Sequence, residues 1–201
     1  MKKLLLMTGA ALMCTAVFSQ DLPKPSPTGE VEQMVGLTEV EIEYSRPGVK
    51  DRTIFGDLVP YGKMWRTGAN KATKISFSTD VKINGKELIA GDYALFTIPG
   101  EDTWELLFNT NLEQWGTRNY QDTEEALRVT AKPEKHSFTE TFTIGIDDVR
   151  NDSASICLYW AETKVCIDMS VEVGAQAMKN IEDKISEIEN AYGVYNTSAR
   201  W

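Results

Sequence analysis

Residues 74–108, KISFSTDVKINGKELIAGDYALFTIPGEDTWELLF, decide the fold, because apolar and polar side chains alternate along them between short turn sequences. Val81 and Ile83 lead into Asn84-Gly85, a pair that tolerates positive φ at both positions and favours a two-residue hairpin. Apolar residues alternate again on both sides of Pro99-Gly100, a second turn sequence. Alternation with a period of two is typical of strands that bury one face.

The same alternation extends outward along the chain. It covers Val40, Ile42 and Tyr44, which alternate with glutamates, and one predicted apolar face formed by Phe138, Phe142, Ile144 and Ile146. Short turns join these strands and no helix separates them, which argues against a parallel sheet. The sequence predicts an all-β domain over residues 30–173, an antiparallel, jelly-roll-like β-sandwich.

A helical period appears only near the end of the sequence, over residues 175–192. Apolar residues recur there at steps of three and four, and acidic residues occupy the other face. We assign residues 174–201 to a C-terminal amphipathic helical segment. The favoured interpretation is a helix that covers the open face of a sheet, and the alternative is a seam for a partner helix. The helical pattern continues to the end of the sequence, so we expect this segment to be cut short.

The N-terminus has the pattern of an export signal. Lys2 and Lys3 precede an apolar run that is too short to cross a bilayer, and residues 20–29 form a polar, Pro-rich linker. We expect a signal peptide over residues 1–19, cleaved after Ser19, and no transmembrane segment. Lipoprotein processing at Cys14 is the alternative, although Met13 is bulky for such a site. The protein is therefore expected in the periplasm or at the cell surface.

The charge balance excludes one class of partner. The chain has 30 acidic and 21 basic residues and a formal net charge of −9, which becomes −11 once Lys2 and Lys3 are removed. Such a field repels the phosphates of nucleic acids and anionic membrane surfaces. We expect no nucleic-acid partner.

Cys157 and Cys166 are the cysteines that remain after cleavage, and an oxidising compartment favours a disulfide between them. Side-chain alternation in the two flanking strands places Trp160 opposite Val165, which sets Tyr159 against Cys166. Cys157 is then a diagonal neighbour, a poor geometry for a disulfide. The pattern therefore favours free thiols.

Few residues suit catalysis or metal binding. His136 is the only histidine, which excludes multi-histidine zinc sites and weakens any catalytic triad. Asp147, Asp148, Asn151 and Asp152 supply oxygen atoms, but their spacing is that of ordinary turn residues rather than an EF-hand. We predict no catalytic residue, no metal and no cofactor.

Residues 44–70 hold the densest chemistry in the chain, with arginines, aromatic rings and glycines in a stretch that has little periodicity. Arginines beside aromatic rings can fasten a loop through its carbonyl groups, or they can hold an anionic or sugar-like ligand. Trp104, Trp115 and Tyr120 could add a stacking surface. The candidate ligand-binding residues are Tyr44, Arg46, Arg52, Trp65, Arg66 and Asn70.

Several motifs resemble an uncharacterised family of exported bacterial proteins, domain of unknown function 2911. The resemblance extends over residues 26–173 and is carried by YSRP (44–47), RTIFG (52–56), WRTGAN (65–70), GDYALFTIP (91–99) and QWG (114–116). It implies no established activity, so no residue gains a catalytic role from it. Longer relatives look similar through the helix and continue into further helices.

Three functions follow from these observations. The first is a non-catalytic binding module for a small anionic or sugar-like envelope ligand. The second is an envelope glycan or ester hydrolase, which would require an acid with a raised pKa in the same cleft. The third is a structural or assembly role through the C-terminal helix and a protein partner. The sequence favours the first.

Overall fold

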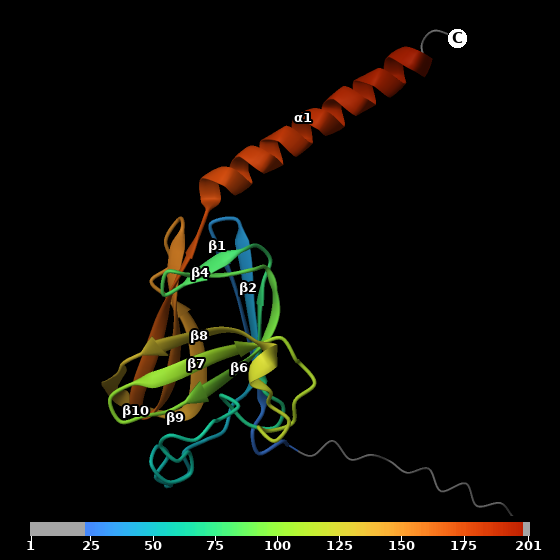
Figure 1. The fold of residues 1–201 in the computed structure, drawn as a ribbon. Coiled ribbons are helices and arrows are strands. Elements are labelled where there is room, and N and C mark those ends of the chain that lie inside the picture. Colours follow the sequence, from blue (N-terminus) through green and yellow to red (C-terminus); the bar gives the residue numbers. More distant parts are fainter. Residues whose placement is uncertain (1–22, 199–201) are drawn as a thin grey trace, which may run out of the picture.

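The computed structural model describes residues 23–198, with the side chains of 196–198 left out. The predicted signal peptide, Cys14 and residues 199–201 lie outside the described residues. The described chain folds into two antiparallel sheets packed as a sandwich, followed by one long helix, as predicted (Figure 1).

Ten strands form the two sheets within the described range. One sheet has six strands in the order β1-β2-β3-β6-β7-β8, and the other has four in the order β5-β4-β10-β9. The elements are β1 Thr28–Val35, β2 Thr38–Ser45, β3 Thr73–Phe77, β4 Val81–Ile83, β5 Lys86–Leu88, β6 Gly91–Ile98, β7 Trp104–Asn109, a 3-10 helix Asp122–Glu124, β8 Glu125–Ala131, β9 Pro133–Asp147, β10 Ser153–Val171 and α1 Val173–Ser198.

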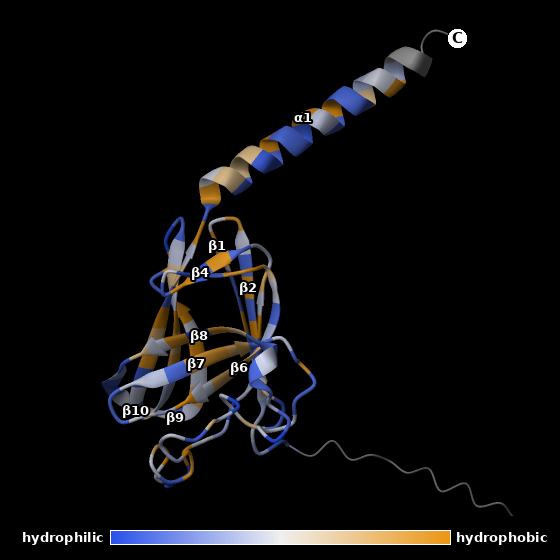
Figure 2. Cartoon of the chain, viewed as in Figure 1, coloured by the Kyte–Doolittle hydropathy of each residue, from blue (hydrophilic) through white to orange (hydrophobic). Residues whose placement is uncertain are grey.

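The core lies between the inner faces of the two sheets. In β2 the buried residues Val40, Ile42 and Tyr44 alternate with glutamates that lie outside the core, as the sequence predicts. Figure 2 shows hydrophobic residues concentrated on the strands of the sandwich. The predicted hairpin is also confirmed, because Asn84 and Gly85 join β4 to β5 with φ values of 47° and 76°.

Irregular pairing between β9 and β10 changes one predicted face. Pairing shifts register between Tyr159 and Ala161 and again before Thr163. Phe142 and Ile144 are buried as expected, but Phe138 is 60% exposed. At each shift β9 supplies two more residues than β10, and Phe138 lies in this irregular stretch, where β9 no longer follows the core as a regular strand does.

The prediction of free thiols is wrong. Cys157 and Cys166 form a disulfide, and their Cα atoms lie 4.1 Å apart. The chain therefore folds back on itself within β10 so that Cys157 lies across from Cys166. The predicted pairing placed Tyr159 at that position, two residues away.

The favoured prediction for the helix is also wrong. α1 does not cover a sheet face but extends away from one end of the sandwich (Figure 1). Only its first turns approach the sandwich, where Ala175, Gln176 and Lys179 line a shallow hollow with Leu37 and Thr38. Among the residues that the structure describes, no helix is long and apolar enough to cross a membrane.

Candidate functional site

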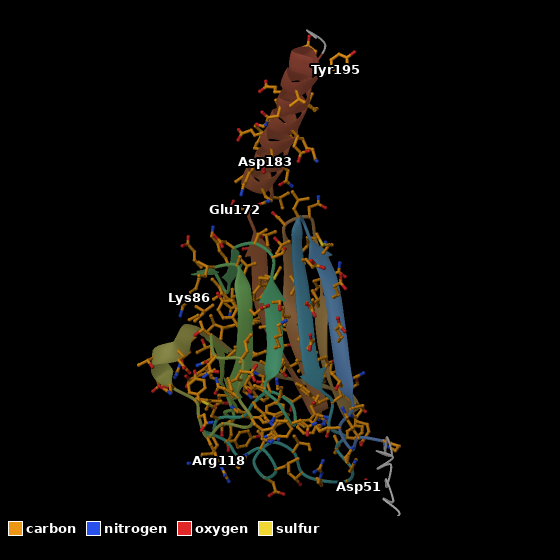
Figure 3. The ribbon with its side chains drawn as sticks, turned by 90° about the vertical axis from the view of Figure 1, so that its right-hand side faces the viewer. Asp51, Lys86, Arg118, Glu172, Asp183 and Tyr195 are labelled. Carbon is orange, nitrogen blue, oxygen red and sulfur yellow. A yellow bond between two sulfur atoms is a disulfide. The ribbon has the colours of Figure 1, made fainter. Side chains whose placement is uncertain are left out.

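The candidate site is built on the connection between β2 and β3, residues 46–72, at the end of the sandwich opposite α1. Figure 3 shows Asp51 in this connection far from Glu172, where the chain enters α1. Backbone hydrogen bonds fasten the connection to both sheets: Phe142 N donates to Pro47 O at 2.9 Å, and Trp65 N donates to Thr97 O at 2.7 Å. The connection is therefore a fixed part of the fold.

Tyr44 and Arg46 serve the fold. The Tyr44 hydroxyl donates to Ile144 O at 3.3 Å and accepts from Ile144 N at 2.9 Å, and its ring packs edge-on against Phe142. The Arg46 guanidinium donates from Nε to Phe142 O at 3.1 Å and from Nη2 to Thr143 Oγ1 at 2.9 Å. Tyr44 thus ties β2 to β9, and Arg46, directly after β2, ties the start of the connection to β9 with hydrogen-bond donors that the protein itself largely satisfies.

The Arg52 guanidinium bonds its own loop but remains accessible to solvent. Its Nε donates to Val49 O at 3.0 Å and its Nη2 donates to Gly48 O at 2.6 Å. These bonds hold the guanidinium against its own loop. The residue as a whole is exposed, so its positive charge still faces outward.

Trp65 belongs to a cluster of aromatic rings in the core. Its indole stacks on Trp160, with centroids 5.6 Å apart and planes 17° apart, and it meets Phe55, Trp104 and Phe142 edge-on. Its Nε1 donates to Gly68 O at 2.9 Å. Trp65 is therefore held rigidly as part of the wall beside the 66–70 turn.

Arg66 differs from the other two arginines. Its side chain has no hydrogen bond or ion pair with any other described residue, and its Nε is buried without a partner. Burial lowers the pKa of this guanidinium from its usual value, although arginine remains protonated at neutral pH. A half-buried cation without an acceptor is unfavourable, because it has lost water and gained no compensating bond.

Arg66 opens onto a hollow of about 310 Å³, here called the Arg66 hollow. Of the described residues that line it, three are basic and none is acidic. Trp160 also lines it, is only 2% exposed, and has an indole Nε1 without a partner. The lining residues are Pro25, Ser26, Pro47, Gly48, Lys50, Arg52, Leu58, Val59, Trp65, Arg66, Gly68, Ala69 and Trp160.

A second, larger hollow of about 680 Å³ lies beside it, here called the Trp115 cleft. Tyr44 and Asn70 line this cleft, and Asn70 Nδ2 donates to Ser45 Oγ at 3.2 Å. Its charges are mixed and close together: Lys71 lies 3.8 Å from Glu113, and Lys74 lies 3.5 Å from Asp92. Trp115, which is 70% exposed, is the large aromatic surface on its rim.

The six predicted site residues therefore do not form one site. Arg52, Trp65 and Arg66 line the Arg66 hollow, Tyr44 and Asn70 line the Trp115 cleft, and Arg46 lines neither. Pro25 and Ser26 line both hollows and so connect them. Of the three extra aromatic residues, only Trp115 is exposed, since Trp104 is buried and Tyr120 packs on Phe96.

Sequence reasoning missed Trp160 and Lys50. The sequence places Trp160 only opposite Val165 in its hairpin, and nothing in it connects Trp160 with a loop almost a hundred residues earlier. Lys50 has positive φ, 49°, in a tight turn beside Asp51, which also has positive φ. A lysine between a valine and an aspartate is a weak turn signal, and it does not indicate that Lys50 lines the same hollow as Arg66.

The carboxyl groups with a shifted pKa do not have the properties of a general acid. The carboxyl groups with a shifted pKa are Glu125, lowered mainly by the hydrogen bond from Arg128, and Glu172, lowered by Lys82. A general acid needs the opposite direction. Within residues 23–198 no group of three or more His, Cys, Asp or Glu side chains could hold a metal ion. The hydrolase alternative stays a prediction.

Comparison with known proteins defines the family. A family model described as "Protein of unknown function (DUF2911)" matches residues 26–169, and the chain belongs to this family. The match includes the strands of the sandwich and the connection that carries the Arg66 hollow. No curated protein and no solved structure matches the chain.

Proposed function

We propose that the protein is an exported, non-catalytic binding module that holds a small anionic or sugar-like ligand in the Arg66 hollow. The observation that carries the proposal is that buried hydrogen-bond donors in this hollow have no acceptor within the protein. Arg66 Nε and Trp160 Nε1 are buried without acceptors, and the hollow has three basic lining residues and no acidic one. A ligand rich in oxygen acceptors would satisfy both donors and the unpaired charge.

Charge and size both support this choice of ligand. Local positive charge stands out in a chain whose formal net charge is −9, and a guanidinium matches the geometry of a carboxylate or phosphate. The hollow, at about 310 Å³, is at the small end of the range for ligand pockets. The indoles of Trp65 and Trp160 are almost fully buried and stacked on each other, and they form a rigid apolar base beneath the hollow rather than an open stacking surface.

Export is supported by two independent features. Residues 1–19 have the charged start, apolar run and small residues of a signal peptide. The disulfide between Cys157 and Cys166 is typical of a protein that folds in an oxidising compartment. We propose a periplasmic or cell-surface location, and the acidic charge of the chain argues against a nucleic-acid partner.

The experiment is a thermal-shift and calorimetric titration with inorganic phosphate, acetate and glucuronate, and with glucose as the uncharged control. A probe present at one hundred times its dissociation constant should raise the melting temperature by roughly 5–10 °C. Arg66→Gln should abolish this shift and leave the melting temperature of the free protein within about 3 °C, since no internal bond is lost. Arg118→Gln removes the same charge from an exposed arginine outside both hollows and should bind like the wild type.

Two outcomes would contradict the proposal. One is that none of the anions shifts the melting temperature of the wild type. The other is that Arg66→Gln and the charge-preserving Arg66→Lys both unfold the free protein, which would assign Arg66 to the scaffold. Retained binding in Arg66→Gln would likewise place the ligand elsewhere.

A further inference from the structure

The exposed side of α1 (Val173–Ser198) carries a continuous apolar seam. Six large side chains along it are each 51–71% exposed, although residues of these types are usually buried. This α1 seam consists of Met178, Ile181, Ile185, Ile188, Tyr192 and Tyr195.

The spacing of the seam is that of a coiled coil. Successive members are separated by three, four, three, four and three residues, a period of 3.5 over almost three heptads. Met178, Ile185 and Tyr192 take the a positions, and Ile181, Ile188 and Tyr195 take the d positions. A helix that packs on a sheet or in a globular core usually shows a broader apolar stripe, whereas a strict a/d seam fits a second helix.

The sandwich does not cover this seam. α1 points away from the sheets along most of its length, and Asp183 and Tyr195 both lie beyond the end of the sandwich (Figure 3). Six exposed apolar side chains in one row are a surface that favours association, because burying it removes apolar area from water.

The charges beside the seam indicate the partner and its direction. Lys184 takes a g position, and Glu182 and Glu189 take e positions. In a parallel pair of identical helices, Lys184 faces Glu189 of the partner subunit, which is attractive. In an antiparallel pair the e positions face one another, so Glu182 faces Glu189 of the partner subunit, which is repulsive. Lys184 now bonds Glu187 at 2.6 Å on the exposed helix surface, a weak pair that can be exchanged.

We propose that α1 joins copies of this chain in a parallel coiled coil through the α1 seam. The partner is a second copy, because one heptad pattern supplies both the apolar surface and its complementary charges. Ile185 at a with Ile188 at d also allows a third strand, since isoleucine at both positions favours trimers.

The first test is the mass of the purified protein in solution, measured by sedimentation equilibrium between 5 and 500 µM. The wild type should have the mass of two or three chains at the upper concentrations. Ile185→Lys should give a monomer with an unchanged sandwich by near-ultraviolet circular dichroism. Ser186→Lys, the same charge change at the neighbouring b position, should assemble like the wild type. A monomeric wild type at 500 µM, or an Ile185→Lys variant that assembles normally, overturns the proposal.

The second test concerns direction. Glu189→Lys places Lys184 against a lysine in the parallel arrangement and should weaken association roughly three- to tenfold. The double variant Lys184→Glu/Glu189→Lys restores opposite charges and should recover the wild-type affinity. Stronger association of Glu189→Lys alone would show an antiparallel pair and overturn the parallel arrangement. The result does not depend on ligand binding in the Arg66 hollow.

Discussion

Arg46, Arg52 and Arg66 have the same side chain in three different surroundings. Arg46 bonds the other sheet, Arg52 bonds its own loop, and Arg66 has no acceptor among the described residues. The sequence could show that arginines and aromatic rings gather in residues 44–70. It could not show which arginine bonds the protein and which is left without an acceptor. Which carbonyl oxygen lies near each guanidinium depends on contacts such as Arg46 with Phe142, almost a hundred positions apart.

This difference predicts opposite outcomes for two substitutions. Arg46→Met removes two hydrogen bonds between the sheets and leaves Phe142 O without a donor, so it should lower the free energy of unfolding by about 2–3 kcal/mol. The melting temperature should fall by roughly 5–10 °C. Urea and thermal unfolding measure both values, with Arg66→Gln as the matched control that should change little. Equal losses in the two variants would mean that both arginines serve the fold.

Glu125 makes the stability depend on pH. Its carboxylate accepts from Arg128 Nε at 2.9 Å, from Arg128 Nη2 at 2.7 Å and from the Tyr120 hydroxyl at 2.7 Å, and Arg128 lowers the pKa of this group. A lowered pKa in the folded state means that the folded protein binds the proton more weakly than the unfolded chain. The contribution is therefore present above the ordinary pKa of 4.5 and is lost as the pH falls through the lower, folded-state value.

We expect Glu125→Gln to flatten the fall in stability between about pH 5 and pH 3. The measurement is the urea midpoint of the wild type and the variant at pH 7, 5 and 3. Glu101→Gln, at an exposed glutamate without a hydrogen bond in the described chain, controls for the loss of one charge. If the two variants respond alike, the pH dependence does not come from the Glu125–Arg128 contact.

Among the elements, the strands were the most predictable, because alternation reports directly which side of a strand is buried. Val40, Ile42 and Tyr44 show this in β2, and Asn84-Gly85 fixes the β4–β5 hairpin. The cysteine pairing failed for a related reason. A register shift of two residues leaves every side chain on the same face, so alternation could not distinguish Cys157 from Tyr159 as the neighbour of Cys166.

The disulfide predicts a measurable loss on reduction. Closing a loop between cysteines nine positions apart stabilises the folded state by about 2–3 kcal/mol in the chain-entropy account. Reduction should therefore lower the melting temperature by roughly 5–10 °C. The double variant Cys157→Ala/Cys166→Ala should melt near the reduced wild type and should not respond to reductant. Alkylation of both thiols in native, unreduced protein would contradict the disulfide.

At the scale of the whole molecule, the existence of the C-terminal helix was predicted correctly, but its position against a sheet face was predicted wrongly. Amphipathicity indicates that one face of a helix avoids water, but it does not say which surface covers that face. The strict 3-4 spacing of the α1 seam was the available signal for a helical partner rather than a sheet.

The sandwich should therefore fold without most of α1. A chain that ends at Lys179 keeps the first turns, which contact the sandwich, and loses only residues that extend beyond it. Its melting temperature at low protein concentration should stay within about 2 °C of the wild type. A chain that ends at Val165 removes part of β10 and should not fold, which provides the contrasting control. A large loss of stability in the longer truncation would mean that α1 supports the sheets.

The opposed placement of the Arg66 hollow and α1 gives the molecule a polarity (Figure 1). If copies are joined in parallel by their helices, all of their Arg66 hollows lie at the same end of the assembly and face in one direction. Weak binding of single acidic groups would then become avid binding to a surface or polymer that repeats such groups, because each further contact is made at a high effective concentration. This avidity would be lost whenever the α1 helices were separated, even with every Arg66 hollow intact.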